Sequence, residues 1–152
     1  MGATLKIYED FYEDSFTLLG IHTTLEDYAL VYELNRCLGL RLKRSKADLD
    51  ITEEISYPLF EWKDELHHRN WTLLANSCKT EQKSVLNDLF PNEPSYAMHH
   101  LVPEHKDMDY LLKIDEAELR TDILKDILEI PKVITSYDIS TDTLKSKQNL
   151  IF

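Results

Sequence analysis

Glycine is scarce in this chain, which has only Gly2, Gly20 and Gly39 among its 152 residues. A P-loop or a dinucleotide-binding fingerprint needs several glycines at fixed spacing, because its backbone must turn tightly and approach the phosphates closely. A Gly-x-Ser-x-Gly nucleophile elbow is also missing. The sequence therefore excludes nucleotide-binding enzymes of these types and gives no sign of a hydrolase built on that elbow.

Cysteine is nearly absent as well, and Cys37 and Cys78 are too far apart to form a Cys-x-x-Cys pair. This spacing excludes zinc-ribbon and thioredoxin-type sites. Residues 1–14 are rich in acidic side chains and do not read as a signal peptide. No apolar run approaches the ~20 residues that a membrane span needs. We therefore expect a cytoplasmic protein with two reduced thiols.

Positive charge is in deficit, since 17 Lys and Arg face 28 Asp and Glu, for a formal net charge of −11. An acidic surface opposes contact with phosphate backbones and anionic lipids. The only basic stretch, residues 41–46, alternates apolar and basic side chains, as the solvated face of a strand does. The composition thus argues against nucleic-acid and membrane binding.

Hydrophobic residues make up 43% of the chain, which is enough for one core at this length. We therefore predict a single domain over residues 1–152. Residues 1–13 are expected to be disordered. Residues 79–94 are polar and end in the breaker Pro91-Asn92-Glu93-Pro94, which predicts a mobile loop with a short helix at 84–89.

Two segments show a strand–helix–strand pattern. In the first, a strand at 16–21 leads to a helix that Thr23 or Thr24 would cap, with Thr23 and Glu26 at capping-box spacing, and Gly39 ends that helix before a strand at 40–44. In the second, a strand at 108–114 would place Met108 on the same face as Tyr110. It leads to a helix capped by Asp115 with Glu118 three residues later, and a strand follows at 133–139. The predicted core stripes of the two helices are Leu30, Val31, Leu34, Cys37 and Leu38, and Leu119, Ile123, Leu124, Ile127 and Leu128.

Between these units, residues 55–62 and 71–77 predict a hairpin with a long polar loop, and residues 96–102 predict a further strand. Pro58 indicates an edge strand or a bulge. The expected fold is α+β, with one sheet of about six or seven mostly antiparallel strands and two main helices on one face. An elaborated ferredoxin-like arrangement satisfies this pattern.

The most distinctive stretch is Val102-Pro103-Glu104, followed after three residues by Met108-Asp109-Tyr110. Pro103 ends a strand, and the carboxylates of Glu104 and Asp109 flank the turn that follows. On the structural interpretation, the side chains of Glu104, Asp109 and Tyr110 hold the turn by hydrogen bonds. On the functional interpretation, Pro103, Glu104, Asp109 and Tyr110 form a binding corner. Acid–base catalysis is disfavoured because no nucleophile can be placed beside the carboxylates.

This stretch resembles the pattern that names the IPExxxVDY family, a bacterial family of unassigned function. Val102 stands where the name has Ile, and Met108 stands where it has Val. The likeness extends to Leu25-Glu26-Asp27-Tyr28 and to the C-terminal residues 149–152. The resemblance implies no activity, cofactor or partner.

Two further sets of side chains are candidates for sites. His100, Glu104 and His105 could supply metal ligands, although solvated surface histidines are the favoured interpretation. The aromatic hairpin carries Phe60, Trp62 and Trp71, which either pack in the core or form an exposed patch for a protein partner. The apolar residues 150–152 pose the same choice, and docking on the chain's own sheet is favoured.

These observations support three hypotheses about function. The leading one is a non-enzymatic cytoplasmic protein-interaction or adaptor domain, without a cofactor and with an unidentified protein partner. The second is a small-ligand regulatory domain, because the second strand–helix–strand unit is similar to half of an ACT-type domain. The third is a small carboxylate- or metal-dependent hydrolase built on Glu104, Asp109 and nearby histidines. The sequence indicates no oligomeric state.

Overall fold

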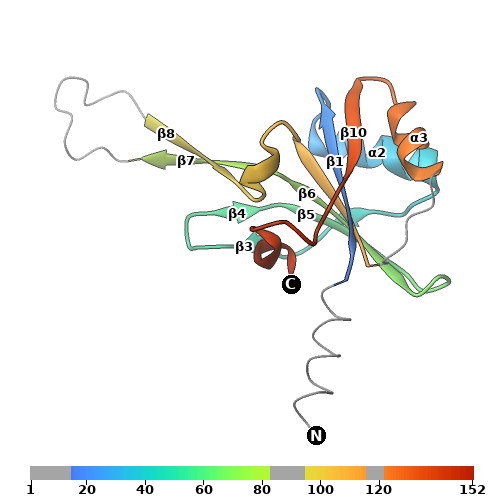
Figure 1. Ribbon diagram of the computed structural model, residues 1–152, viewed down its shortest axis with the longest axis horizontal. Coiled ribbons are helices and arrows are strands. Elements are labelled where there is room, and N and C mark those ends of the chain that lie inside the picture. The colour runs from blue at the N-terminus through green and yellow to red at the C-terminus, as the bar shows by residue number, and fades with distance from the viewer. Residues whose placement is uncertain (1–14, 83–94, 116–121) are drawn as a thin grey trace, which may run out of the picture.

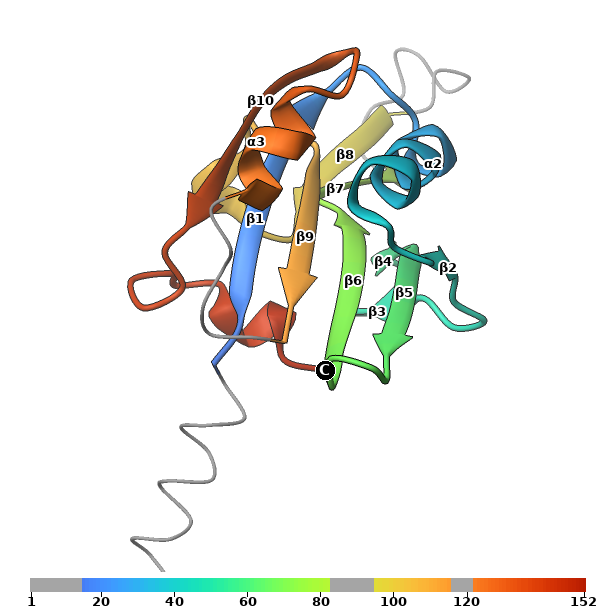
Figure 2. The ribbon, with the colours of Figure 1, turned by 90° about the vertical axis from the view of Figure 1, so that its right-hand side faces the viewer.

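A computed structural model describes residues 15–82, 95–115 and 122–152. Its centre is a six-stranded antiparallel sheet, and two helices lie on one face of that sheet (Figures 1 and 2). The fold is therefore α+β, as predicted. In spatial order the strands are β10 (Val133–Ile139), β1 (Thr17–Thr23), β9 (Tyr110–Ile114), β6 (Arg69–Ala75), β5 (Leu59–Asp64) and β2 (Lys43–Arg44).

The connections confirm both strand–helix–strand units. Strand β1 pairs antiparallel with β9 on one side and with β10 on the other, so β9 and β10 run parallel and are joined through α3 (Asp122–Leu128). Four successive antiparallel pairings lead from β1 to β2, so these two strands also run parallel. They are joined through α2 (Asp27–Leu38). The β10-β1-β9 part has ferredoxin-like strand order. Strands β6, β5 and β2 extend it, which makes the arrangement an elaborated one.

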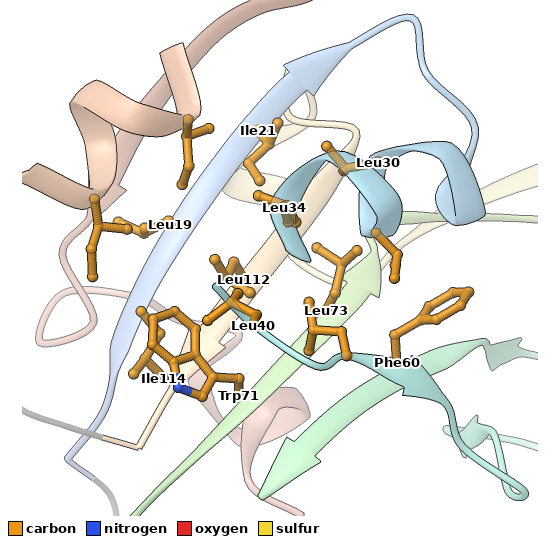
Figure 3. Packing of buried hydrophobic residues seen from close by; sticks show 14 of the residues in the cluster. Leu19, Ile21, Leu30, Leu34, Leu40, Phe60, Trp71, Leu73, Leu112 and Ile114 are labelled. Atoms are coloured by element: carbon orange, nitrogen blue, oxygen red, sulfur yellow. The ribbon is translucent and has the colours of Figure 1, made fainter. Parts of the chain in front are cut away.

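The helix-side core is built from alternate residues of the central strands (Figure 3). Leu19 and Ile21 of β1 and Leu112 of β9 pack against the buried α2 residues Leu30 and Leu34. On α3, Ile123 and Ile127 are buried as predicted, but Leu128 is 48% exposed. Leu119 and Glu118, the residue expected to join Asp115 in a cap, lie outside the described residues.

The opposite face of the sheet carries a second core. It is covered by the short hairpin of β3 (Leu49–Asp50) and β4 (Ser56–Tyr57), by the segment 101–109, and by the C-terminal turn η2 (Lys147–Leu150). Leu150 is fully buried there. Lys113 Nζ lies 4.4 Å from the centroid of the Phe152 ring, but Ile151 and Phe152 are 39% and 53% exposed, so only Leu150 of these three residues is docked in the chain's own core.

A two-stranded ribbon of β7 (Ser77–Gln82) and β8 (Ser95–His100) projects from the sheet (Figure 1). This ribbon corrects two predictions. Residues 79–82 belong to a strand and not to a mobile loop, while 83–94, including the predicted helix at 84–89, lie outside the described residues. The strand predicted at 96–102 forms, but it pairs with β7 and takes no place in the main sheet.

Several local predictions fail for identifiable reasons. Thr23 does not cap α2, because the helix begins three residues later, after Glu26, without a side-chain cap. The Thr23 hydroxyl instead donates to Lys132 O at 2.7 Å and accepts from Leu25 N at 3.1 Å. Gly39 ends α2 in the left-handed region at φ 67°, as predicted. The strand predicted at 40–44 shrinks to Lys43–Arg44, and the backbone N and O of Leu42 bond to the Asn35 side chain and not to a neighbouring strand.

Pro58 does not mark an edge strand, because β5 lies between β6 and β2. It separates β4 from β5 where the chain passes from the small hairpin into the main sheet. In the described ranges, no helix is long and apolar enough to cross a membrane.

Candidate functional site

The corner formed by residues 101–110 is held by Asn76, a residue between β6 and β7 with no solvent exposure. Asn76 Oδ1 accepts a hydrogen bond from Val102 N at 2.7 Å. Its Nδ2 donates to the carbonyls of His105 at 2.8 Å and Met108 at 3.0 Å. The Asn76 backbone adds a bond from its N–H to Asp109 O and accepts one from Leu101 N, both at 2.9 Å. Asn76 thus provides hydrogen-bond partners for backbone groups along the segment 101–109.

Glu104 ties this corner to the C-terminal segment. The turn η1 (Pro103–His105) places its side chain so that Oε2 accepts from both the N–H and the hydroxyl of Ser146, each at 3.1 Å. Partial burial opposes the charge, but these donors outweigh it and lower the pKa of Glu104 below its ordinary value. The Glu104 carboxylate is therefore already engaged in hydrogen bonds that join the corner to Ser146.

Asp109 ties the corner to the end of β1. Its Oδ2 accepts from His22 Nδ1 at 2.6 Å and from Thr23 N at 2.9 Å. A carboxylate only accepts, so His22 carries its proton on Nδ1 and keeps Nε2 for other contacts. This pairing orients an imidazole as a base would be oriented. Among the described residues, however, no hydroxyl or thiol is bonded to His22 Nε2.

Tyr110 and Pro103 complete the predicted set. The Tyr110 hydroxyl donates to Leu25 O at 3.0 Å, just before α2, and its ring packs against the helix-side core. Burial raises its pKa to about 12, so it remains a donor at neutral pH. Asp109 and Tyr110 therefore reach the stretch 22–25 between β1 and α2, whereas Glu104 reaches Ser146 near the C-terminus, so the three side chains do not converge on one partner.

Met108 lies on the other face of the sheet from the one that strand alternation predicts. It was expected to share a face with Tyr110, but it lies against Gly20 on the opposite side of the sheet. A Cβ on Gly20 would come within 2.5 Å of Met108 Cγ. Gly20 is thus the residue that lets the corner approach β1 closely.

The three residues proposed as metal ligands are separated by their contacts. His105 Nδ1 lies 2.8 Å from the hydroxyl of Tyr137, which also contacts Asp107 Oδ2 at 3.3 Å. Glu104 bonds to Ser146, and His100 lines a hollow that Glu104 and His105 do not line. Within the described ranges, no group of three or more His, Cys, Asp or Glu could hold a metal ion.

The predicted aromatic patch is also not formed. Phe60 and Trp71 are 8% and 4% exposed and belong to the helix-side core (Figure 3), and Trp62 packs partly buried against the same core. The three rings pack across the strands and in the core, which is the first of the two alternatives given for them above.

A hollow of about 350 Å³ lies beside the corner. Ile51 and Ile55 of the β3–β4 hairpin form one wall, and residues 98–101 of β8 and its extension form the other. Pro103, Lys106 and Asn149 complete the lining. Pro103 is thus the motif residue that borders an open space. The sequence missed Asn76 and this hollow, since both depend on contacts between distant segments.

No protein-family model, curated protein or solved structure gave a significant match to this chain. The assignment of function therefore depends on the site itself.

Proposed function

We propose that this chain is a non-enzymatic, cytoplasmic protein-interaction domain of the IPExxxVDY family, and that its docking site is the hollow beside β8. The observation that carries this proposal is an apolar hollow next to an unpaired strand edge. Met98 is 57% exposed and Ile51 is 41% exposed at this hollow. Contiguous exposed apolar side chains are typical of binding surfaces.

The lining shows that the hollow meets the edge of β8. Four consecutive residues, 98–101, border it. Successive side chains of a strand point to opposite faces, so residues from both faces of β8 border the hollow, as at a strand's edge. In the described part of the chain, β8 pairs with β7 alone. An extended partner segment could therefore add to this edge by backbone hydrogen bonds.

The contacts of the motif support a non-catalytic role. The carboxylates of Glu104 and Asp109 are engaged by Ser146 and by His22 with Thr23. These bonds fix the corner and so hold the root of the ribbon at a defined distance from Ile51 and Ile55. On this proposal the motif builds the docking site, and the hollow carries the recognition.

Partner capture with a matched pair of variants tests the proposal. Met98→Glu places a charge at the hollow, and Ile134→Glu places one on β10, at a strand residue with 58% exposure against 57% for Met98. A buried interface residue often contributes more than ~1 kcal/mol, so Met98→Glu should reduce capture of a specific partner from native lysate about tenfold. Ile134→Glu should capture as the unmodified protein does. Equal capture by both variants would refute the assigned site.

A further inference from the structure

Tyr57 brings a hydroxyl without a hydrogen-bond partner to the hollow beside β8. The residue belongs to β4, is only 1% exposed and packs in the core on the face of the sheet opposite the helices. Among the described residues, none forms a hydrogen bond with Tyr57 Oη. Buried polar groups in proteins nearly always have a partner, so an open hydroxyl at this depth indicates a partner from outside the chain.

The Tyr57 hydroxyl opens into the hollow. It is not one of the side-chain polar groups of the described residues that are sealed from solvent without a partner, so the small exposed area of Tyr57 includes Oη. Because Tyr57 lines the hollow, this opening lies on the floor of the hollow. Burial, together with the nearby Cys78 thiol, raises the pKa of Tyr57 to about 12. At neutral pH the hydroxyl is therefore protonated and can donate a hydrogen bond.

The charge of the lining favours an anion as the acceptor. Lys106 borders the hollow, and within the described ranges its ammonium group is in no ion pair. No carboxylate lines the hollow, since the exposed Glu53 and Glu54 of the nearby β3–β4 turn are not part of the lining. A carboxylate from outside would accept a charge-assisted hydrogen bond from Tyr57 and neutralise Lys106.

The walls and the size of the hollow define the rest of the ligand. Ile51, Ile55 and Met98 contribute apolar side chains to the lining. The volume of about 350 Å³ lies in the range of small-molecule pockets. Since one water occupies about 30 Å³ in the liquid, this space suits a molecule of about ten non-hydrogen atoms. The geometry therefore favours one charged group on a short apolar stem.

We propose that the hollow beside β8 binds a small organic carboxylate with an apolar stem, whose carboxylate accepts a hydrogen bond from Tyr57 and lies near Lys106. The stem lies between the β3–β4 hairpin and Met98. This site goes beyond the proposed docking of a protein segment, and its binding is measured without a protein partner. If both occupants use the hollow, they exclude each other, and the ligand regulates docking.

A two-dimensional NMR titration of the full-length protein with hexanoate, at constant pH and ionic strength, tests the site. Hexanoate should shift the backbone amides of residues 55–57 and 98–101 in a saturable manner, with a Kd of about 1 mM or tighter. Hexanamide has the same stem without the charge, and acetate has the charge without the stem, so each should bind at least about tenfold more weakly. Equal binding of acetate would leave only a surface anion contact and overturn the inference. The absence of a saturable shift with hexanoate would also overturn it, because solvent alone would then serve the Tyr57 hydroxyl.

A matched pair of tyrosine variants tests the hydroxyl. Tyr57→Phe removes only Oη, and Tyr32→Phe removes the hydroxyl of a tyrosine on α2 that is 65% exposed. Tyr57→Phe should weaken hexanoate binding about tenfold or more, because hydrogen bonds to charged groups are among the stronger ones, whereas Tyr32→Phe should leave it unchanged. Without hexanoate, the Tm of Tyr57→Phe should equal or exceed that of the unmodified protein, since no internal bond is lost. A lower Tm, or unchanged hexanoate binding, would overturn the inference.

A second pair of variants tests the charge. Lys106→Gln should reduce the affinity for hexanoate toward that for hexanamide, and Lys43→Gln, at an exposed lysine on β2, should leave it unchanged. Equal losses in the two variants would overturn the assigned role of Lys106, because the net charge of the protein would then set the affinity. Capture of a protein partner is measured separately, so failure of these titrations leaves the proposed function standing.

Discussion

Replacing Asn76 with alanine removes the side chain that holds the 101–109 turn together. Three of its bonds are fully buried, namely the one from Val102 N, the one to Met108 O and a longer one of 3.4 Å to Val102 O. Val102 O keeps a second bond, from His105 N, when the Asn76 side chain is removed. The bond to His105 O is only partly buried, so water can replace it there. Alanine therefore leaves one donor and one acceptor without a partner in the core.

The size of the effect follows from these two groups. A buried polar group left unsatisfied costs about 1–3 kcal/mol, so the expected loss in the free energy of unfolding is about 2–6 kcal/mol. A domain of this size loses about 2–4 °C in Tm per kcal/mol, and a loss near 4 kcal/mol would lower Tm by about 8–16 °C.

Equilibrium urea unfolding of the variant, with Asn35→Ala as the matched control, measures this loss. Asn35 makes the same kind of paired bond, to the backbone N and O of Leu42, at a partly buried position. Its removal should cost about 1–2 kcal/mol, because solvent replaces part of the bonding. The reasoning is refuted if Asn76→Ala is no more destabilising than Asn35→Ala.

Two further predictions concern the contacts around the corner. Gly20→Ala brings a Cβ within 2.5 Å of Met108 Cγ, and Met108 is only 1% exposed, so we expect a loss of about 1–3 kcal/mol in urea unfolding. In the double variant with Met108→Ala, the loss should be smaller than the sum of the two single losses, because the clash is gone. Strictly additive losses would contradict the contact. Glu104→Gln should destabilise the protein at neutral pH, because the lowered pKa means that the folded state stabilises the charged carboxylate. That contribution is present above the ordinary pKa of the group and is lost as pH falls through the lowered value, so the Tm difference from the unmodified protein should vanish in acid; a difference independent of pH would count against it.

The fold was predictable where a segment buries one regular face. Strand β10 occupies 133–139 as expected, and α2 buries Leu30, Val31 and Leu34 as its periodicity indicates. The ribbon of β7 and β8 was not predictable in the same way. It projects from the sheet, so its residues 77–82 need no alternation of apolar and polar side chains. A strand without a buried face has the composition of a loop.

The site was predictable only in part. The motif placed Glu104, Asp109 and Tyr110 at a turn, but their side chains bond to Ser146, Thr23 and Leu25 in distant segments. The turn itself is held by the side chain of Asn76, which no sequence pattern indicated. Asn76 carried no sequence signal, because its side chain bonds to residues 26 to 32 positions away. A polar residue that directly follows the apolar run 71–75 is the one feature that could have drawn attention to it.

The position of Asn76 couples the motif to the proposed docking edge. Asn76 precedes β7 directly, and the segment 101–109 follows β8, so the bonds that close the corner also fix both strands at the root of the ribbon. An isolated two-stranded ribbon is marginally stable in water and depends on such anchoring. Loosening the corner should therefore let β8 move relative to Ile51 and Ile55, which form the facing wall. On this account, substitutions at Asn76 or Asp109 weaken docking without touching the docked segment, because the motif determines where the edge of β8 lies.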